Sequence, residues 1–114
     1  MISNTGYISG AYQGAGVEAG SATITNAGTI VQTGGSGAGL HFNGSGNNTV
    51  INRGVVTGAD GTAVLFNSGN DLLEIDTGAV FNGTVDGGAG TNTVEFLANS
   101  HGTLSNNFTN FQTT

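Results

Sequence analysis

A glycine-rich segment, Gly87-Gly-Ala-Gly-Thr-Asn-Thr-Val94, has the residue types and spacing of a calcium-binding repeat. It approximates the nonapeptide G-G-x-G-x-D-x-U-x, in which consecutive copies supply carboxylate and carbonyl oxygens to Ca²⁺. Asn92 stands at the aspartate position, and no second copy follows directly. Asp71 belongs to a less complete match to the motif one repeat earlier. A plain glycine-rich turn is the competing interpretation, and we prefer it. Asp71 and Asn92 are thus the only calcium candidates, and we expect no other cofactor.

The densest group of acidic residues comprises Asp71, Glu74, Asp76 and Asp86. Glu74 and Asp76 alternate with apolar neighbours, so both are expected to point outward from one strand. Paired outward carboxylates would suit acid and base roles in glycan cleavage, while solvated surface charge is the competing interpretation. Enzymes that act on acidic polysaccharide usually also use basic residues, and the chain has one, Arg53. We therefore expect a protein that is not an enzyme, with a glycan-active one as the least favoured alternative.

Neither histidine has a second histidine at the spacing of metal ligands. His41 lies between Leu40 and Phe42 and is expected to face outward, and His101 lies in a Ser-His-Gly turn. Structural and catalytic zinc sites need three or four ligands at fixed spacing. No serine stands in a G-x-S-x-G elbow, the local sequence that presents the nucleophile of many hydrolases.

Charge excludes two classes of partner. Of the 114 residues, seven are acidic and one is basic, giving a formal net charge of -6. Nucleic acids and anionic membrane surfaces are bound by clusters of Lys and Arg, so we expect neither partner. No apolar run approaches the ~20 residues that span a bilayer, so direct membrane insertion is not expected. Met1 is followed by a polar, glycine-bearing segment, and we expect any export signal to lie outside this chain.

The elements that would position these side chains are set by an internal repeat. An Asn/Asp-x-Gly triplet recurs four times, with its glycines spaced 22, 26 and 24 residues apart. A β-branched residue stands two positions after each glycine, at Ile8, Ile30, Val56 and Val80. The triplets begin and end at Asn4 and Gly6, Asn26 and Gly28, Asn52 and Gly54, and Asp76 and Gly78.

Two further short strands are predicted in each repeat. One reads small-apolar-x-apolar, and its inward residues are expected to be Val17, Leu40, Val64 and Val85, joined by Ala19, Phe42 and Phe66. The other is Thr49-Val50-Ile51, then Leu72-Leu73-Glu74-Ile75, then Thr93-Val94-Glu95-Phe96. Alternation of apolar and polar residues with period two indicates strands, and the period of 22 to 26 residues suits one coil of a solenoid.

The repeat predicts an all-β fold, a right-handed parallel β-helix (β-solenoid) of about four to five coils. Residues 1–114 would form a single domain. We interpret the triplets as structural corner motifs: asparagine tolerates left-handed backbone and can form stacked amide ladders, and glycine allows positive φ. An antiparallel sandwich need not keep a constant period, and a disordered linker would not keep β-branched residues in register.

Three strings resemble the passenger repeats of bacterial type V autotransporters: Ile24-Thr-Asn-Ala-Gly-Thr-Ile30, Gly61-Thr-Ala-Val-Leu-Phe66 and the segment from Gly87 to Val94. The tail from Gly102 to Gln112 is similar to segments where such passengers move to the next repeat block. The resemblance covers residues 2 to 112. It implies a fragment of a longer passenger that is exported and displayed extracellularly on a Gram-negative outer membrane.

Two functions other than catalysis follow from this fold and resemblance. The first is a rigid stalk that mediates surface attachment or cell–cell aggregation, with a host-surface or glycan ligand as its partner. The second is a self-assembling subunit, because a β-helix ends in open strand edges that are templates for pairing. Copies would then stack end to end into an extracellular filament, the heterologous arrangement that does not close.

Overall fold

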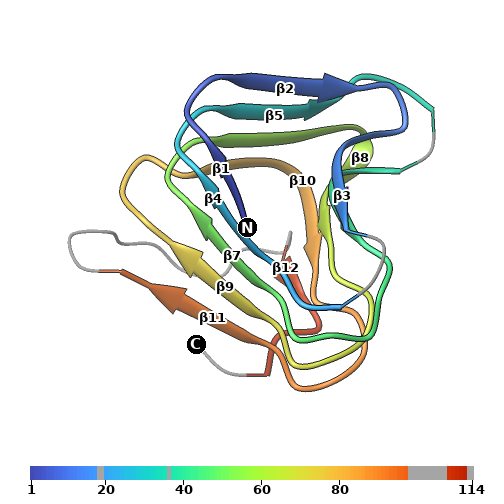
Figure 1. Ribbon diagram of the computed structural model, residues 1–114, viewed down its shortest axis with the longest axis vertical. Coiled ribbons are helices and arrows are strands. Elements are labelled where there is room, and N and C mark those ends of the chain that lie inside the picture. Colours follow the sequence, from blue (N-terminus) through green and yellow to red (C-terminus); the bar gives the residue numbers. More distant parts are fainter. Residues whose placement is uncertain (18–19, 36, 98–107, 113–114) are drawn as a thin grey trace.

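The computed structural model describes residues 1–17, 20–35, 37–97 and 108–112, and their regular structure is entirely β-strand (Figure 1). The strands are β1 (Ile2–Asn4), β2 (Tyr7–Gly10), β3 (Gln13–Val17), β4 (Thr23–Asn26), β5 (Thr29–Gln32), β6 (Ala38–Phe42), β7 (Thr49–Asn52), β8 (Val55–Leu65), β9 (Leu72–Ile75), β10 (Val80–Asp86), β11 (Thr93–Phe96) and β12 (Phe108–Thr109). Among the described residues, no helix is long and apolar enough to cross a membrane.

The strands stack in parallel around one axis and form a right-handed parallel β-helix of about four coils, which confirms the predicted fold class. One face is the sheet β1-β4-β7-β9-β11. The second contains β2, β5 and the first parts of β8 and β10. The third contains β3, β6, the last parts of β8 and β10, and β12. Figure 1 shows the chain following these faces in turn and returning one strand further along.

The core fills the space between the three faces. Ile24, Val50, Leu73 and Val94 stack in register inside the first face, 26, 23 and 21 residues apart. Leu40, Val64 and Val85 stack inside the third face, as expected. All seven side chains are fully buried. Each buried aliphatic side chain contributes roughly 1.5–3 kcal/mol through the hydrophobic effect, so the stacking of coils supplies the stability that isolated short strands lack.

A ladder of three buried asparagines joins the first three coils at one corner. The Asn4 side-chain nitrogen donates to Asn26 Oδ1 at 2.9 Å, and the Asn26 nitrogen donates to Asn52 Oδ1 at 2.9 Å. Each Oδ1 also accepts a hydrogen bond from the backbone N–H of the glycine two residues on. These bonds satisfy polar groups that would be costly to bury alone. We call Asn4, Asn26 and Asn52 the first amide ladder.

The fourth corner differs from the prediction, because Ile75 rather than Asp76 is in register with Asn52. Asp76 and Gly78 lie in a turn that is closed by a hydrogen bond from Ala79 N–H to the Asp76 carbonyl oxygen at 3.1 Å. This corner is two residues longer than the Asn-x-Gly corner, since Val80 is in register with Val55. The extra length turns Val80 outward, 43% exposed, and Phe81 takes the predicted core position beside Val56.

The corner glycines are needed for a reason other than the one the sequence suggested. Positive φ occurs at Gly78, at 93°, but not at Gly6, Gly28 or Gly54. A Cβ atom on Gly54 would instead lie 2.1 Å from the Gly28 carbonyl oxygen in the preceding coil. A Cβ on Gly28 would lie equally close to the Gly6 carbonyl oxygen. Glycine therefore allows the backbones of successive coils to approach at this corner.

We expect Gly54→Ala to lower the free energy of unfolding by about 2–3 kcal/mol, because the new methyl group must displace backbone. Gly34→Ala is the matched control, since a Cβ there meets nothing within 4 Å and its φ is not positive. The control should change stability by less than about 0.5 kcal/mol. Urea unfolding followed by circular dichroism measures both, and equal stabilities would show that the coils do not approach this closely.

Candidate functional site

Both calcium candidates lie in a second ladder of polar side chains. It comprises Asn48, Asp71, Asn92 and Gln112, and we call it the second amide ladder. Asp71 Oδ1 accepts from Asn48 N–H at 2.8 Å, Asn92 Oδ1 accepts from Asp71 N–H at 2.9 Å, and Gln112 Oε1 accepts from Asn92 N–H at 2.7 Å. Asn48 and Gln112 were not predicted from the sequence. For Asn48 the signal was present, because it directly precedes β7 just as Asp71 precedes β9 and Asn92 precedes β11.

The Asn92 side chain faces carbonyl oxygens with its nitrogen. Its Nδ2 donates to Gly87 O at 2.8 Å and lies 3.1 Å from Asn110 O. The carbonyls of Gly88 and Ala89 are within 3.4 Å of the same nitrogen. Calcium sites present oxygen ligands at 2.3–2.6 Å around the ion. Here the side-chain nitrogen of Asn92, an N–H donor, lies among the carbonyl oxygens where an ion would have to bind. The arrangement is that of a hydrogen-bonded glycine-rich turn.

Asp71 is the one acidic rung of the second amide ladder and is only 2% exposed. Its Oδ1 also accepts from Asn48 Nδ2 at 3.2 Å, and its Oδ2 has no hydrogen-bond partner among the described residues. Burial raises the pKa of this carboxyl, and the hydrogen bonds from Asn48 oppose that rise. Among the described residues, no three ligating side chains of His, Cys, Asp or Glu gather into a metal site.

We expect calcium to leave the thermal unfolding midpoint unchanged, because the oxygens around Asn92 are already bound to an N–H donor. The measurement is differential scanning calorimetry with calcium in excess and again after addition of a chelator. An ion that binds only the folded state raises the midpoint by mass action. A midpoint that rises with calcium and falls with chelator would contradict this expectation and restore Asp71 and Asn92 as ligands.

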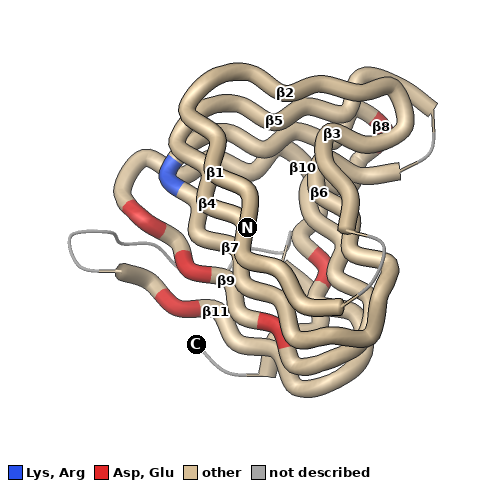
Figure 2. The backbone as a smooth tube through the Cα atoms, in the orientation of Figure 1, with Lys and Arg blue, Asp and Glu red and all other residues tan. Residues whose placement is uncertain are grey.

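The four carboxylates that the sequence grouped are not brought together. Asp71 is buried in its ladder, and Asp86 lies on the third face, where its Oδ1 accepts from Gly88 N–H and Asn110 Nδ2. Glu74 pairs in register instead with Glu95, a neighbour the sequence analysis did not single out (Figure 2). Like charges on directly opposed positions repel one another. Glu74 and Glu95 therefore form a pair of neighbouring negative charges on β9 and β11.

The histidine on the third face is half-buried on β6. His41 Nδ1 lies 3.3 Å from Gln13 Oε1, in the adjacent strand of the preceding coil. This contact links two coils through a side-chain amide, which does not titrate. His101 and Ala19, also named from the sequence, lie outside the described residues.

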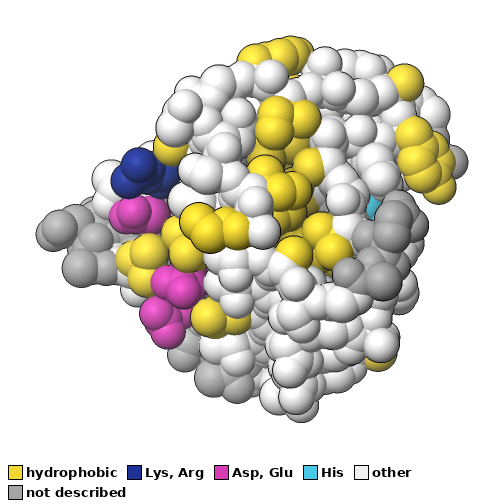
Figure 3. Space-filling model, in the orientation of Figure 1, with side chains coloured by type: hydrophobic (Ala, Val, Ile, Leu, Met, Phe, Trp, Pro, Cys, Tyr) yellow, Lys and Arg dark blue, Asp and Glu magenta, His cyan; other side chains and the backbone are white. Residues whose placement is uncertain are grey.

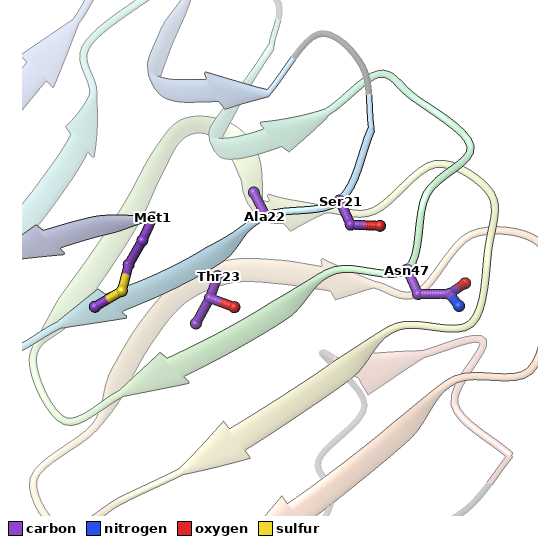
Figure 4. Close-up of a pocket in the computed structure, with 5 residues that line it drawn as sticks. All are labelled: Met1, Ser21, Ala22, Thr23 and Asn47. Atoms are coloured by element: carbon purple, nitrogen blue, oxygen red, sulfur yellow. The ribbon is translucent and has the colours of Figure 1, made fainter.

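An open hollow of about 310 Å³ lies beside the start of β4 and is lined by Met1, Ser21, Ala22, Thr23 and Asn47 (Figure 4). Its polar side chains are a serine, a threonine and an asparagine. Figure 4 shows Ser21 and Asn47 pointing away from Met1 and Thr23, so these groups do not converge on one point. The hollow lacks the convergent polar groups that mark a small-molecule site.

Open strand edges lie at the N-terminal end, by which we mean the outer edges of β1, β2 and β3. Within the part of the chain that the structure describes, each of these strands is paired on one side only, with β4, β5 and β6 respectively. Ile2, Ile8, Ala15 and Val17 pack on the core but are only partly buried, whereas their partners one coil further on are fully buried. Figure 3 shows apolar side chains gathered at the middle of this end.

Aromatic side chains cover part of the opposite end. Phe111 packs edge-on against the Phe66 ring with centroids 6.3 Å apart, and Phe108 packs edge-on against Phe81 at 5.7 Å. Gln112 extends the second amide ladder by one rung. The two ends therefore differ in chemistry. The N-terminal end exposes strand edges and core, whereas the C-terminal end carries a partial aromatic cover, with β11 paired only with β9 among the described residues.

Comparison of the chain with protein-family models, curated proteins and solved structures found no match.

Proposed function

We propose that this chain is a structural segment of an exported passenger of the type V autotransporter kind. It would serve as a rigid stalk on the surface of a Gram-negative cell and mediate surface attachment or cell–cell aggregation. The observation that carries the proposal is the regular stack of coils whose N-terminal end exposes strand edges and apolar side chains. Such an end suits a module within a longer solenoid. Solenoids of this kind gain length and stiffness by adding coils. The proposal assigns the chain no catalytic role.

The outer surface supports an adhesive role. Side chains at outward positions form rows along the axis, such as Ser9, Val31, Thr57 and Asn82, which occupy one register on the second face. Asn82 Nδ2 donates to Thr57 Oγ1 at 3.0 Å, so neighbouring coils order each other's polar groups. Hydroxyl and amide groups fixed at strand spacing can exchange hydrogen bonds with the hydroxyls of a glycan or with a host-cell surface protein.

Surface display tests this function. The chain, in one copy or in several tandem copies, is placed between an export signal and an outer-membrane barrel in a Gram-negative host. We expect added protease to remove it from intact cells, and the cells to settle or attach faster than cells that carry the barrel alone. A Val64→Asp variant is the control, because it buries an unpaired charge in the core and unfolds the stack. Equal settling and attachment of all three strains would refute the adhesive role.

The open strand edges favour a second candidate, end-to-end assembly of copies into a filament. Unpaired edges of parallel strands are templates for further pairing. Light scattering of the purified chain over a wide concentration range separates the two candidates. A constant mass near 11.2 kDa supports a stalk module, and a mass that climbs with concentration supports assembly.

A further inference from the structure

We propose that the N-terminal end is a docking surface for one further β-helical coil, and that this coil carries asparagine and glycine in register with Asn4 and Gly6. The inference rests on the proposed stalk function and names the chemistry of the neighbour in the stalk. Three independent features of the end support it: its apolar surface, an open acceptor on the first amide ladder, and a glycine that nothing within the described residues requires.

The apolar surface has the pattern of an internal coil boundary. Ile2 and Ile8 occupy the same registers as Ile24 and Ile30, and Ala15 and Val17 the same registers as Leu40 and Phe42. The residues of the second coil are fully buried because the first coil covers them. A coil with the same inward pattern would cover the first coil in the same way, and its strands would pair with the open edges of β1, β2 and β3.

The first amide ladder identifies the polar group that this coil must bring. Asn26 Oδ1 accepts two hydrogen bonds, one from Gly28 N–H at 3.2 Å and one from Asn4 Nδ2 at 2.9 Å. Asn4 Oδ1 accepts one from Gly6 N–H at 3.0 Å, and no second donor reaches it from the described residues. The missing donor is on the side of the N-terminal end. A side-chain amide from a preceding coil would occupy the place that Asn4 Nδ2 occupies against Asn26.

The third feature is steric. Gly28 and Gly54 are required because a carbonyl oxygen of the coil before each of them would lie 2.1 Å from an added Cβ. The nearest atom to a Cβ on Gly6 is Asn4 Oδ1, at 3.9 Å, which is ordinary contact, and its φ is not positive. Nothing within the described residues therefore requires glycine at position 6. A stacked coil would supply the requirement, because its glycine carbonyl would lie where the Gly6 carbonyl lies against Gly28.

A second copy of this chain fits the end less well than such a coil. The last strand of the first face, β11, places Phe96 in the register of Ile75, which is the register of the first amide ladder. If β11 of one copy paired with β1 of another, Phe96 would lie against Asn4, and its side chain would offer no N–H donor to Asn4 Oδ1. Asparagine two residues before glycine supplies both the donor and the room for close approach.

The test is a chain in which residues 2–23 are duplicated between Met1 and Ile2, so that the added coil brings its own asparagine and glycine in the proposed register. Amide hydrogen exchange is followed in β1 and β2 of the original first coil. We expect exchange there to slow by about tenfold or more, since edge strands become internal strands. Unchanged exchange would overturn the proposal.

Two variants make the test specific. Gly6→Ala in the original coil should leave the melting curve of the parent chain unchanged but should remove the added protection in the extended chain. Asn4→Leu in the added coil alone should weaken that protection. If Gly6→Ala leaves the protection of the extended chain intact, the steric argument and the proposal fail.

Protection of β1 in the parent chain that grows with protein concentration would identify a second copy as the occupant, and would overturn the proposal in favour of assembly. All of these readouts use purified protein. They can therefore fail while the display experiment succeeds, or succeed while it fails, so the docking inference and the stalk function are tested separately.

Discussion

Phe66→Ala is expected to lower the free energy of unfolding by about 3–5 kcal/mol, a large part of the 5–15 kcal/mol that is typical of a domain. Phe66 is fully buried, and its ring is stacked on Phe42 with centroids 4.9 Å apart. On its other side it meets the edge of Phe111. Truncation would leave a cavity between two coils whose backbones are fixed by strand pairing, so the surroundings cannot collapse to fill it.

Tyr12→Ala is the control for loss of an aromatic ring, since Tyr12 is 59% exposed. Chemical denaturation of both variants measures the difference, and the control should remain within about 0.5 kcal/mol of the parent. If Phe66→Ala is as stable as Tyr12→Ala, the ring does not lie between the coils and the inward placement of the third-face residues is wrong.

The fold was predictable because its signals are local and repeated. Alternation around Leu40, Val64 and Val85 set the inward face of each strand, and the spacing of these residues set the length of a coil. The structure confirms the parallel β-solenoid and the burial of these three side chains. A one-residue slip moves a side chain to the opposite face of a strand, so a regular pattern of apolar residues carries strong information about register.

The fourth corner is a part of the fold that the repeat pattern did not predict correctly. Asp76 and Gly78 look like another Asn-x-Gly corner, but Ile75 takes the ladder register and the turn is two residues longer. Only the pairing of Val80 with Val55 reveals that length. The reason for glycine at positions 28 and 54 could not be predicted either. A carbonyl oxygen from another coil excludes a side chain there, and the sequence does not show which coils are adjacent at that point.

The candidate site was less predictable than the fold. Ile2 and Ile24 are the same residue type in the same register, and the sequence alone does not tell which of them lies at an end. The sequence named Asp71 and Asn92 for their resemblance to a calcium repeat, whereas the structure shows them as consecutive rungs of one ladder. A ladder depends on which turns stack on which, and that is known only once the coils are in register.

The second amide ladder leads us to expect that one substitution of a buried residue raises the free energy of unfolding, whereas most such substitutions lower it. Asn92 directs its side-chain nitrogen at turn carbonyls, and Asp71 has an oxygen without a partner, Oδ2, at the corresponding place one coil earlier. An asparagine at position 71 would keep the acceptor that binds Asn48 and would replace the unpartnered oxygen with a donor. Leaving a buried polar group without a partner costs about 1–3 kcal/mol.

We therefore expect Asp71→Asn to raise the free energy of unfolding by about 1–3 kcal/mol at neutral pH. The gain should shrink in acid. Burial raises the pKa of the Asp71 carboxyl above its usual value of 3.8 in the folded chain, so between 3.8 and the raised pKa the folded chain binds more protons than the unfolded chain. The contribution of Asp71 to stability is therefore fully present below 3.8 and is lost as pH rises through the folded pKa.

Urea unfolding of the parent chain and the variant, at neutral pH and near pH 3.8, measures this dependence. The difference between the two proteins removes contributions from the other carboxylates. Glu74→Gln, which relieves the repulsion between Glu74 and Glu95, measures how much stability the loss of one negative charge at a more exposed position gives by itself. We expect the variant to be the more stable protein at neutral pH and the two to converge in acid, because a protonated Asp71 can donate to a carbonyl as an amide does. If Asp71→Asn destabilises the chain at neutral pH, the unpartnered oxygen has a partner in solution, and a bound cation at Asp71 becomes the better account of the ladder.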